Sequence, residues 1–124
     1  ADNGVDGVVY FAIGPGKTER MIIQVKSGGA NRGTIATLKG DMQREKAELA
    51  ALITLDEPTR PMIEEAKTAG LYAHPIMERN YDRIRIVTVR EMIEHGARLD
   101  LPLSYDAVKP GKKGSDDSQL SLKL

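Results

Sequence analysis

The chain of 124 residues has no cysteine, no tryptophan and one phenylalanine. The absence of cysteine excludes disulfide bridges, cysteine-ligated zinc and a thiol nucleophile, and it gives no sign of an oxidising compartment. We therefore expect a cytoplasmic protein. The scarcity of aromatic rings disfavours a surface that stacks unpaired bases. If the protein binds nucleic acid, we expect double-stranded DNA.

Long apolar runs and an excess of one charge are also missing. No apolar run approaches the roughly 20 residues that a membrane-spanning helix needs, so we expect no membrane partner. Lysine plus arginine and aspartate plus glutamate number 18 each, so the overall basic character of many nucleic-acid binders is absent. Bases do outnumber acids between Lys17 and Lys46. A binding surface and an ordinary solvated surface explain this local excess equally well.

Hydrophobic patterning predicts alternating strands and helices. Segments rich in valine, isoleucine and aromatic residues predict strands at 5–13 and 21–25, which a glycine-rich turn joins into an antiparallel hairpin. Apolar residues at helical spacing predict a helix over about 34–49, capped by Thr34. The same reasoning predicts strands at 51–55 and 84–89 and helices at 61–70 and 90–95. This order predicts an α/β fold, a mixed sheet flanked by helices.

The chain is long enough for one domain. We assign residues 1–105 to the domain core. Residues 106–124 are rich in lysine, serine, glycine and aspartate, with little apolar mass to bury, and we expect them to form a flexible tail. The Ala1-Asp2-Asn3-Gly4 start is not typical of a natural N-terminus, so we expect a fragment of a longer protein.

A candidate site emerges where the first two strands meet. Gln24 and Lys26 share one face of their strand because side chains alternate with a period of two. If the hairpin turns symmetrically about Pro15, Asp6 lies opposite Gln24 and on the same face, whereas a slip of one residue would reverse it. The Asp6 carboxylate, the Gln24 amide oxygen and the Val25 carbonyl then form an oxygen-rich site suited to Mg²⁺. The Val25 side chain is expected in the core.

Lys26 beside such a metal can hold a phosphate and help to activate a water molecule. Structural explanations remain open, because an aspartate before Gly7 is also typical of a turn and a lysine at a strand end is often only solvated. The Gly14–Thr18 segment lacks the first glycine of a P-loop. His74 and His95 have no partners at metal-binding spacing, so we interpret them as surface or helix-end histidines.

The pattern Asp6-Gly7 followed by Gln24-Val25-Lys26 resembles the split Asp…(Asp/Glu)-x-Lys motif of the PD-(D/E)xK nuclease superfamily. More narrowly, the chain is similar to the Mrr-like restriction endonuclease domains associated with site-specific DNA methyltransferases. The resemblance extends over residues 2–102. It implies a restriction-endonuclease-like fold and Mg²⁺-dependent hydrolysis of DNA phosphodiester bonds, with Mn²⁺ as a substitute. Asp6, Gln24 and Val25 would hold the metal, and Lys26 would act as base or charge stabiliser.

Domains of this type usually contribute a glutamate from a helix before the first strand, and the chain starts too late to contain that helix. The resemblance thus leaves two functions open. One is an endonuclease domain of a restriction-modification protein that cuts duplex DNA, with a homodimer favoured if both strands are cut. The alternative is a catalytically inactive nuclease-fold module that binds DNA or a partner methyltransferase.

Overall fold

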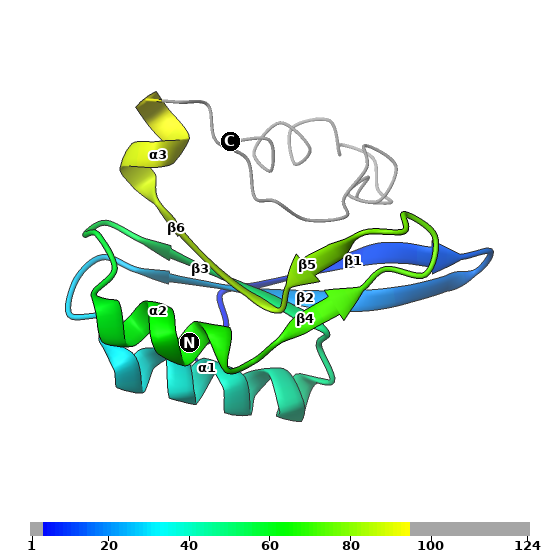
Figure 1. Cartoon of the computed structure of the whole chain (residues 1–124), viewed down its shortest axis with the longest axis horizontal. Helices are drawn as coiled ribbons and strands as arrows, with labels where there is room; N and C mark the ends of the chain where they lie inside the picture. Colours follow the sequence, from blue (N-terminus) through cyan, green and yellow to red (C-terminus); the bar gives the residue numbers. More distant parts are fainter. Residues whose placement is uncertain (1–3, 95–124) are drawn as a thin grey trace.

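The computed structural model describes residues 4–94 (Figure 1). Its elements follow the predicted order, with two short strands added. The strands are β1 (Gly7–Gly14), β2 (Lys17–Lys26), β3 (Leu49–Thr54), β4 (Leu71–Ala73), β5 (Asn80–Asp82) and β6 (Ile84–Thr88). The helices are α1 (Arg32–Glu45), α2 (Arg60–Lys67) and α3 (Val89–Glu94). The expected domain boundary at 105, the tail at 106–124 and His95 lie outside the described residues.

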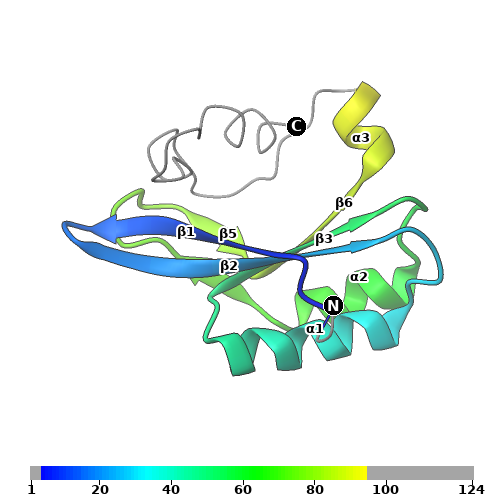
Figure 2. The same cartoon turned by 180° about the vertical axis from the view of Figure 1, so that it is seen from behind.

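The main sheet has the strand order β1-β2-β3-β6. β1 is antiparallel to β2, whereas β3 is parallel to both β2 and β6. The parallel neighbours require crossover connections, which α1 and α2 supply. Figures 1 and 2 show these two helices side by side on one face of the sheet, with the β4–β5 ribbon on the other face. The predicted α/β fold with a mixed sheet flanked by helices is confirmed. No helix in residues 4–94 is long and apolar enough to cross a membrane.

Helix α1 begins and ends earlier than predicted. Its N-cap is Asn31, whose side chain accepts a hydrogen bond from the Thr34 backbone while the Thr34 hydroxyl accepts one from the Asn31 backbone. Thr34 therefore completes a capping box instead of forming the cap itself. The helix ends at Glu45 because Lys46 adopts a left-handed conformation with φ of 58°. Leu49, predicted at the end of the helix, starts β3.

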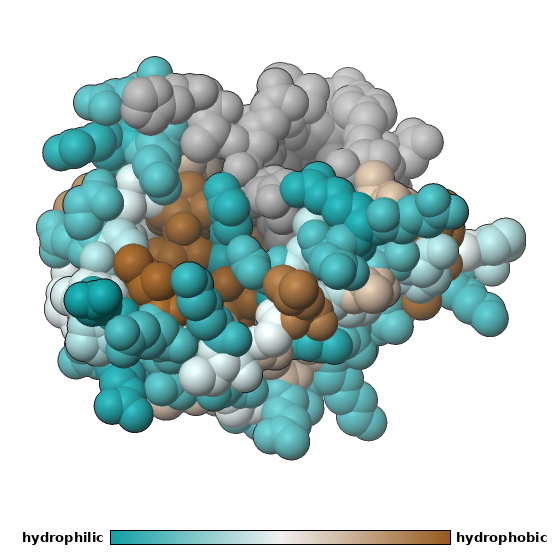
Figure 3. Space-filling view, in the orientation of Figure 1, coloured by the Kyte–Doolittle hydropathy of each residue, from teal (hydrophilic) through white to brown (hydrophobic). Residues whose placement is uncertain are grey.

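The helices bury their apolar stripes against one face of the sheet. Ile22 and Leu52 from the central strands contact this helix-side core, whose helical members are Ile35, Leu38, Met42, Met62 and Ala66. Ile63, predicted on the apolar side of α2, is 41% exposed instead. It lies one position beyond Met62 on the helix, about 100° around the axis, and so faces away from the sheet. Figure 3 shows apolar side chains at the surface between α2 and α3, over β6.

The β4–β5 ribbon covers the opposite face near the hairpin end of β1 and β2. Two tyrosines of the ribbon, Tyr72 and Tyr81, pack with Val9, Phe11, Met21 and Leu49 in a second buried cluster. His74 follows β4 and is buried, with 5% of its surface exposed. The expectation of a surface histidine at this position is therefore wrong, because the ribbon folds back onto the sheet and carries His74 against the Ala12 carbonyl.

Candidate functional site

The β1–β2 register determines which predicted site residues share a face. Gly7 pairs with Ile23 and Val8 with Ile22, which is the register expected for a turn about Pro15. Ile22 packs in the helix-side core. Because strand side chains alternate, Gln24 and Lys26 point toward the same helix-covered side as Ile22. The ladder has the predicted register from Gly7 to Ala12, and Asp6 and Gln24 lie just beyond its last pair.

Asp6 lies one residue before β1 and is fixed to β2 at two points. Its backbone N–H donates to the Ile23 carbonyl at 2.7 Å, and its Oδ2 accepts from the Val25 N–H at 2.8 Å. These two hydrogen bonds fall on either side of Gln24, so Asp6 is brought to the level of the glutamine. Through this bond, one carboxylate oxygen of Asp6 holds the open end of the hairpin together, which gives the aspartate a structural role.

Val25 lies on the other side of the strand, but its side chain is not in the core. It is 52% exposed, because the β4–β5 ribbon covers the sheet around Met21 and Leu49 and does not extend to the end of β2. The Val25 N–H faces β1, where it meets Asp6. In an antiparallel ladder the N–H and C=O of one residue point the same way, so the Val25 carbonyl also faces the Asp6 side.

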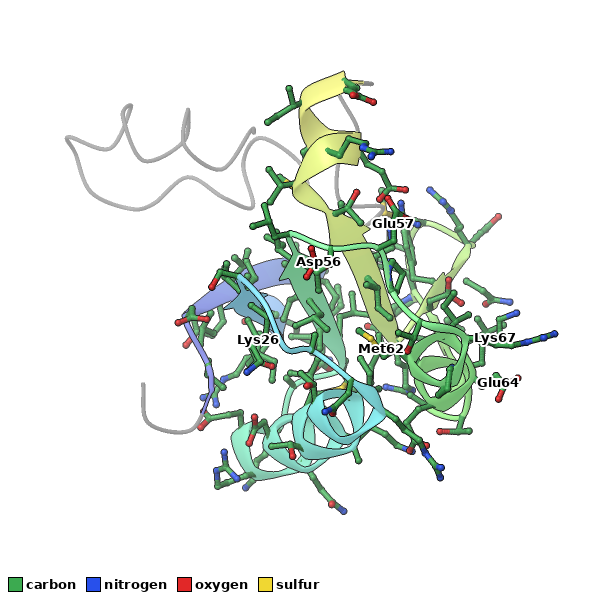
Figure 4. The ribbon with its side chains drawn as sticks, turned by 90° about the vertical axis from the view of Figure 1, so that its left-hand side faces the viewer. Lys26, Asp56, Glu57, Met62, Glu64 and Lys67 are labelled. Atoms are coloured by element: carbon green, nitrogen blue, oxygen red, sulfur yellow. The ribbon has the colours of Figure 1, made fainter. Side chains whose placement is uncertain are left out.

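Lys26 is the last residue of β2 and is half-buried. It pairs in register with Thr54, the last residue of β3, and Asp56 lies two residues after the end of that neighbouring strand. Figure 4 shows Lys26 and Asp56 at the end of the sheet turned toward the viewer, with Lys67 on the outer side of α2. The carboxyl ends of parallel strands are the usual place for ligands in α/β sheets. Lys26 therefore occupies a position suited to contacting an anionic ligand.

Asp41 on α1 is a site residue that the sequence reasoning missed. It is buried, with 3% exposed, and its Oδ1 accepts from Arg44 at 2.5 Å. Its Oδ2 is buried and has no hydrogen-bond partner within residues 4–94. A signal was present in the sequence: an aspartate three residues after Leu38 falls on the apolar stripe of the helix. A charge on a buried stripe indicates a specific role.

Gly4 brings Asp41 and Gln24 to a common point. A Cβ added at Gly4 would lie 2.9 Å from Gln24 Nε2 and 3.5 Å from Asp41 Oδ2. Gly4 also has φ of +76°, a conformation that residues with a Cβ rarely adopt. Glycine is thus required here both for its backbone angle and for the space it leaves. The amide of Gln24 and the unpartnered oxygen of Asp41 border that space.

Most of the basic side chains between Lys17 and Lys46 form ion pairs or hydrogen bonds within the domain. Arg32 and Lys39 both contact Glu65 at 3.1 Å, and Arg44 pairs with Asp41. Arg20 donates to the backbone carbonyl of Glu45 at 2.8 Å. Much of the excess therefore joins α1 to α2 and to the sheet. This pattern favours the structural explanation for most of these bases, and it leaves Lys26 as the base at the strand ends.

The donors at the strand ends fit a divalent cation weakly. Asp6 contributes one carboxylate, Gln24 an uncharged amide oxygen and Val25 a carbonyl, while Lys26 brings a positive charge. Mg²⁺ is usually held by one or two carboxylates together with waters and substrate phosphate. Within residues 4–94, no group of three or more histidine, aspartate or glutamate side chains is arranged to hold a metal. The net charge of the proposed set is close to zero, so a cation would depend on the substrate for further ligands.

The mixed sheet, with an aspartate before one strand and Gln-x-Lys at the end of the next, defines a domain of the restriction-endonuclease-like class. Residues 1–94 match the model of the family described as NACHT-associated inactive Restriction Endonuclease 1. The chain belongs to this family. Searches of the curated proteins and of the solved structures found no match to the chain. Membership confirms the restriction-endonuclease-like character inferred from the sequence.

Proposed function

We propose that this domain is a catalytically inactive nuclease-fold module that binds double-stranded DNA without cutting it. The observation that carries the proposal is the near-neutral charge of the expected donor set. Its acid, Asp6, has one oxygen engaged by the Val25 N–H, Lys26 offsets the charge of Asp6, and the nearby Asp41 is paired with Arg44. Such a set attracts a metal weakly, whereas Lys26 can still contact a DNA phosphate. The description of the family as inactive supports the same reading.

The test is DNA binding and plasmid nicking measured on the same protein. We expect fluorescence anisotropy to show that duplex DNA binds in preference to single-stranded DNA at matched salt, because the chain is poor in stacking aromatics. Lys26→Ala should weaken duplex binding about fivefold and lower the salt dependence by about one phosphate contact. Lys67→Ala, on the outer side of α2 (Figure 4), is the matched control and should bind like the unchanged protein.

Supercoiled plasmid provides the catalytic arm. We expect no nicking with Mg²⁺ or Mn²⁺ in excess, at protein concentrations that saturate binding. If Lys26→Ala and Lys67→Ala bind duplex DNA equally, the proposed contact is wrong. Preference for single strands would remove duplex DNA as the ligand.

A second candidate function is metal-dependent DNA cleavage, with Mg²⁺ or Mn²⁺ held by Asp6, Gln24 and the Val25 carbonyl and with Lys26 as base or charge stabiliser. It is supported by the β1–β2 register and by the Asp6 N–H bond to Ile23, which bring Asp6 to the level of Gln24. Nicking that Lys26→Ala and Asp6→Asn both abolish would establish this function and overturn the inactive one. For both candidate functions, we propose that the chain is an Mrr-like domain.

The partner domain is part of the same proposal. The family description names an association with NACHT domains, and the sequence resembles nuclease-like domains associated with DNA methyltransferases. Next to a methyltransferase, a module that holds DNA would act for a neighbouring domain that modifies the DNA. We accordingly expect DNA binding to persist in the isolated chain.

A further inference from the structure

Asp41 and Gln24 present complementary groups that the rest of the site does not use. A carboxylate is an acceptor only, and the buried Oδ2 of Asp41 needs a donor. The side-chain amide of Gln24 offers two N–H donors, and its nitrogen borders the same space beside Gly4 as Asp41 Oδ2 does. A buried polar atom left without a partner is costly. The two atoms lie 2.9 and 3.5 Å from the same point beside Gly4, so a hydrogen bond between them would satisfy both groups.

We propose that Asp41 is a positioning residue that holds the Gln24 side chain with its amide nitrogen inward and its amide oxygen toward the Asp6 and Lys26 end of the strands. The reverse orientation would set two oxygens against each other in a buried space. Arg44 occupies the other oxygen of Asp41, so only Oδ2 is available to Gln24. The use of the outward oxygen as a ligand rests on the second candidate function, but the contact itself does not.

The proposed contact accounts for an amide, and not an acid, at position 24 of this chain. A glutamate at position 24 would direct a second carboxylate at the buried Oδ2 of Asp41, and like charges in a buried space repel strongly. Glutamine removes the charge and supplies the donor that Asp41 lacks. The amide at 24 and the acid at 41 are therefore a matched pair. A glutamate introduced at 24 alone should lower the stability of the fold.

The first test uses the unchanged chain without DNA or metal. Side-chain amide protons of Gln24, observed by NMR, should exchange with solvent more slowly than those of Gln43, which is exposed on the same helix as Asp41. Asp41→Ala should remove the difference, whereas Asp56→Ala, at an exposed acid, should preserve it. Equal exchange for the two glutamines in the unchanged chain would overturn the contact.

The second test is a double-mutant cycle on stability at pH 7. We expect Gln24→Glu to lower the urea midpoint by about 1 M, and the combination with Asp41→Asn to recover most of that loss. Equal losses in both backgrounds would overturn the pairing. If Gln24→Glu does not fold at pH 7, the pairing still requires that Gln24→Glu with Asp41→Asn folds there. Neither test uses DNA, so both can be interpreted even if the proposed DNA-binding function is wrong.

Discussion

The two faces of the sheet are covered in different ways. On one face, α1 and α2 contribute aliphatic side chains such as Leu38 and Met62, and the two helices are joined at their surface by Arg32 and Lys39, which share Glu65. The Lys39 hydrogen bond, followed by that of Arg32, holds the pKa of the Glu65 carboxyl below its usual value. Charged contacts thus lie at the rim of an aliphatic core.

On the other face, the β4–β5 ribbon contributes aromatic rings and a buried histidine. Phe11 and Tyr72 meet edge to face with ring centroids 5.8 Å apart, and the His74 ring lies 6.0 Å from Phe11. Burial raises the pKa of Tyr72, and the nearby carboxylates of Glu19 and Glu48 raise it further. Here polar groups lie inside the cluster, where each needs a fixed partner.

His74 illustrates this requirement. Its Nδ1 accepts from the backbone N–H groups of Ile76 and Met77, at 3.0 and 3.1 Å, and its Nε2 lies 3.0 Å from the Ala12 carbonyl. The neutral ring with a proton on Nε2 satisfies all three contacts. The helix layer is thus held by general apolar burial, whereas the ribbon depends on a few specific contacts. Single substitutions should therefore act differently on the two faces.

The largest effect is expected from Phe11→Ala. Phe11 is completely buried between the sheet and the ribbon, and removing a buried phenylalanine ring costs about 3–5 kcal/mol in unfolding free energy. Urea denaturation would measure the loss, and NMR would show shifts concentrated at Tyr72 and Tyr81. Leu38→Ala is the matched change on the helix face. It should cost about 2–5 kcal/mol and leave the ribbon signals in place.

A loss below about 1 kcal/mol for Phe11→Ala would mean that the ribbon packs loosely. In that case the contrast between the two faces would not hold. The contrast would also be contradicted if the NMR signals of the ribbon shifted as far in Leu38→Ala as in Phe11→Ala.

A smaller effect is expected from His74→Phe, which keeps a ring in the cluster but removes the three polar contacts. The N–H groups of Ile76 and Met77 and the carbonyl of Ala12 would lose their partner, and unsatisfied buried groups cost about 1–3 kcal/mol each, less where water reaches them. We expect a total loss of about 2 kcal/mol. Amide hydrogen exchange at Ile76 and Met77 should accelerate. Unchanged exchange at both amides would show that the histidine does not hold this turn.

The same contrast explains what sequence reasoning found. Periodic apolar residues, such as Ile35, Leu38 and Met42, predict the helix face because a packed helix repeats its contacts along one stripe. The central strand at Leu52 was found from its continuous apolar run. β4 and β5 were missed because each has three residues, too few to show alternation. The partners of His74 are backbone groups at Ala12, Ile76 and Met77, and no side-chain pattern marks them.

The part of the site that depends on local pairing was predictable, whereas the part that depends on contacts between distant segments was not. The turn pairs Gly14 with Lys17, and a register shift between Ala12 and Gly14 gives the ladder that leads toward Asp6. Local sequence predicted the alignment of Asp6 with Gln24 but not this shift. The exposure of Val25 depends on where the ribbon stops, and the approach of Asp41 to Gln24 depends on how α1 packs and on the chain crossing at Gly4. These are contacts between distant segments. The sequence contains their residues but not their distances.

The smallest effect tests the ion pairs at the rim of the helix face. The folded pKa of Glu65 lies below its ordinary value of 4.5, so its contribution to stability is complete above that pH and is lost as pH falls toward the folded pKa. Glu65→Gln should therefore lower the urea midpoint slightly at pH 7, and the difference from the unchanged chain should shrink below pH 4.5. Glu64→Gln, at a side chain 68% exposed beside Arg60, is the control and should change the midpoint little at any pH. A Glu65→Gln difference that stays constant through the acidic range would show that charge at Glu65 does not join the two helices, and the rim would then contribute no more than the general burial beneath it.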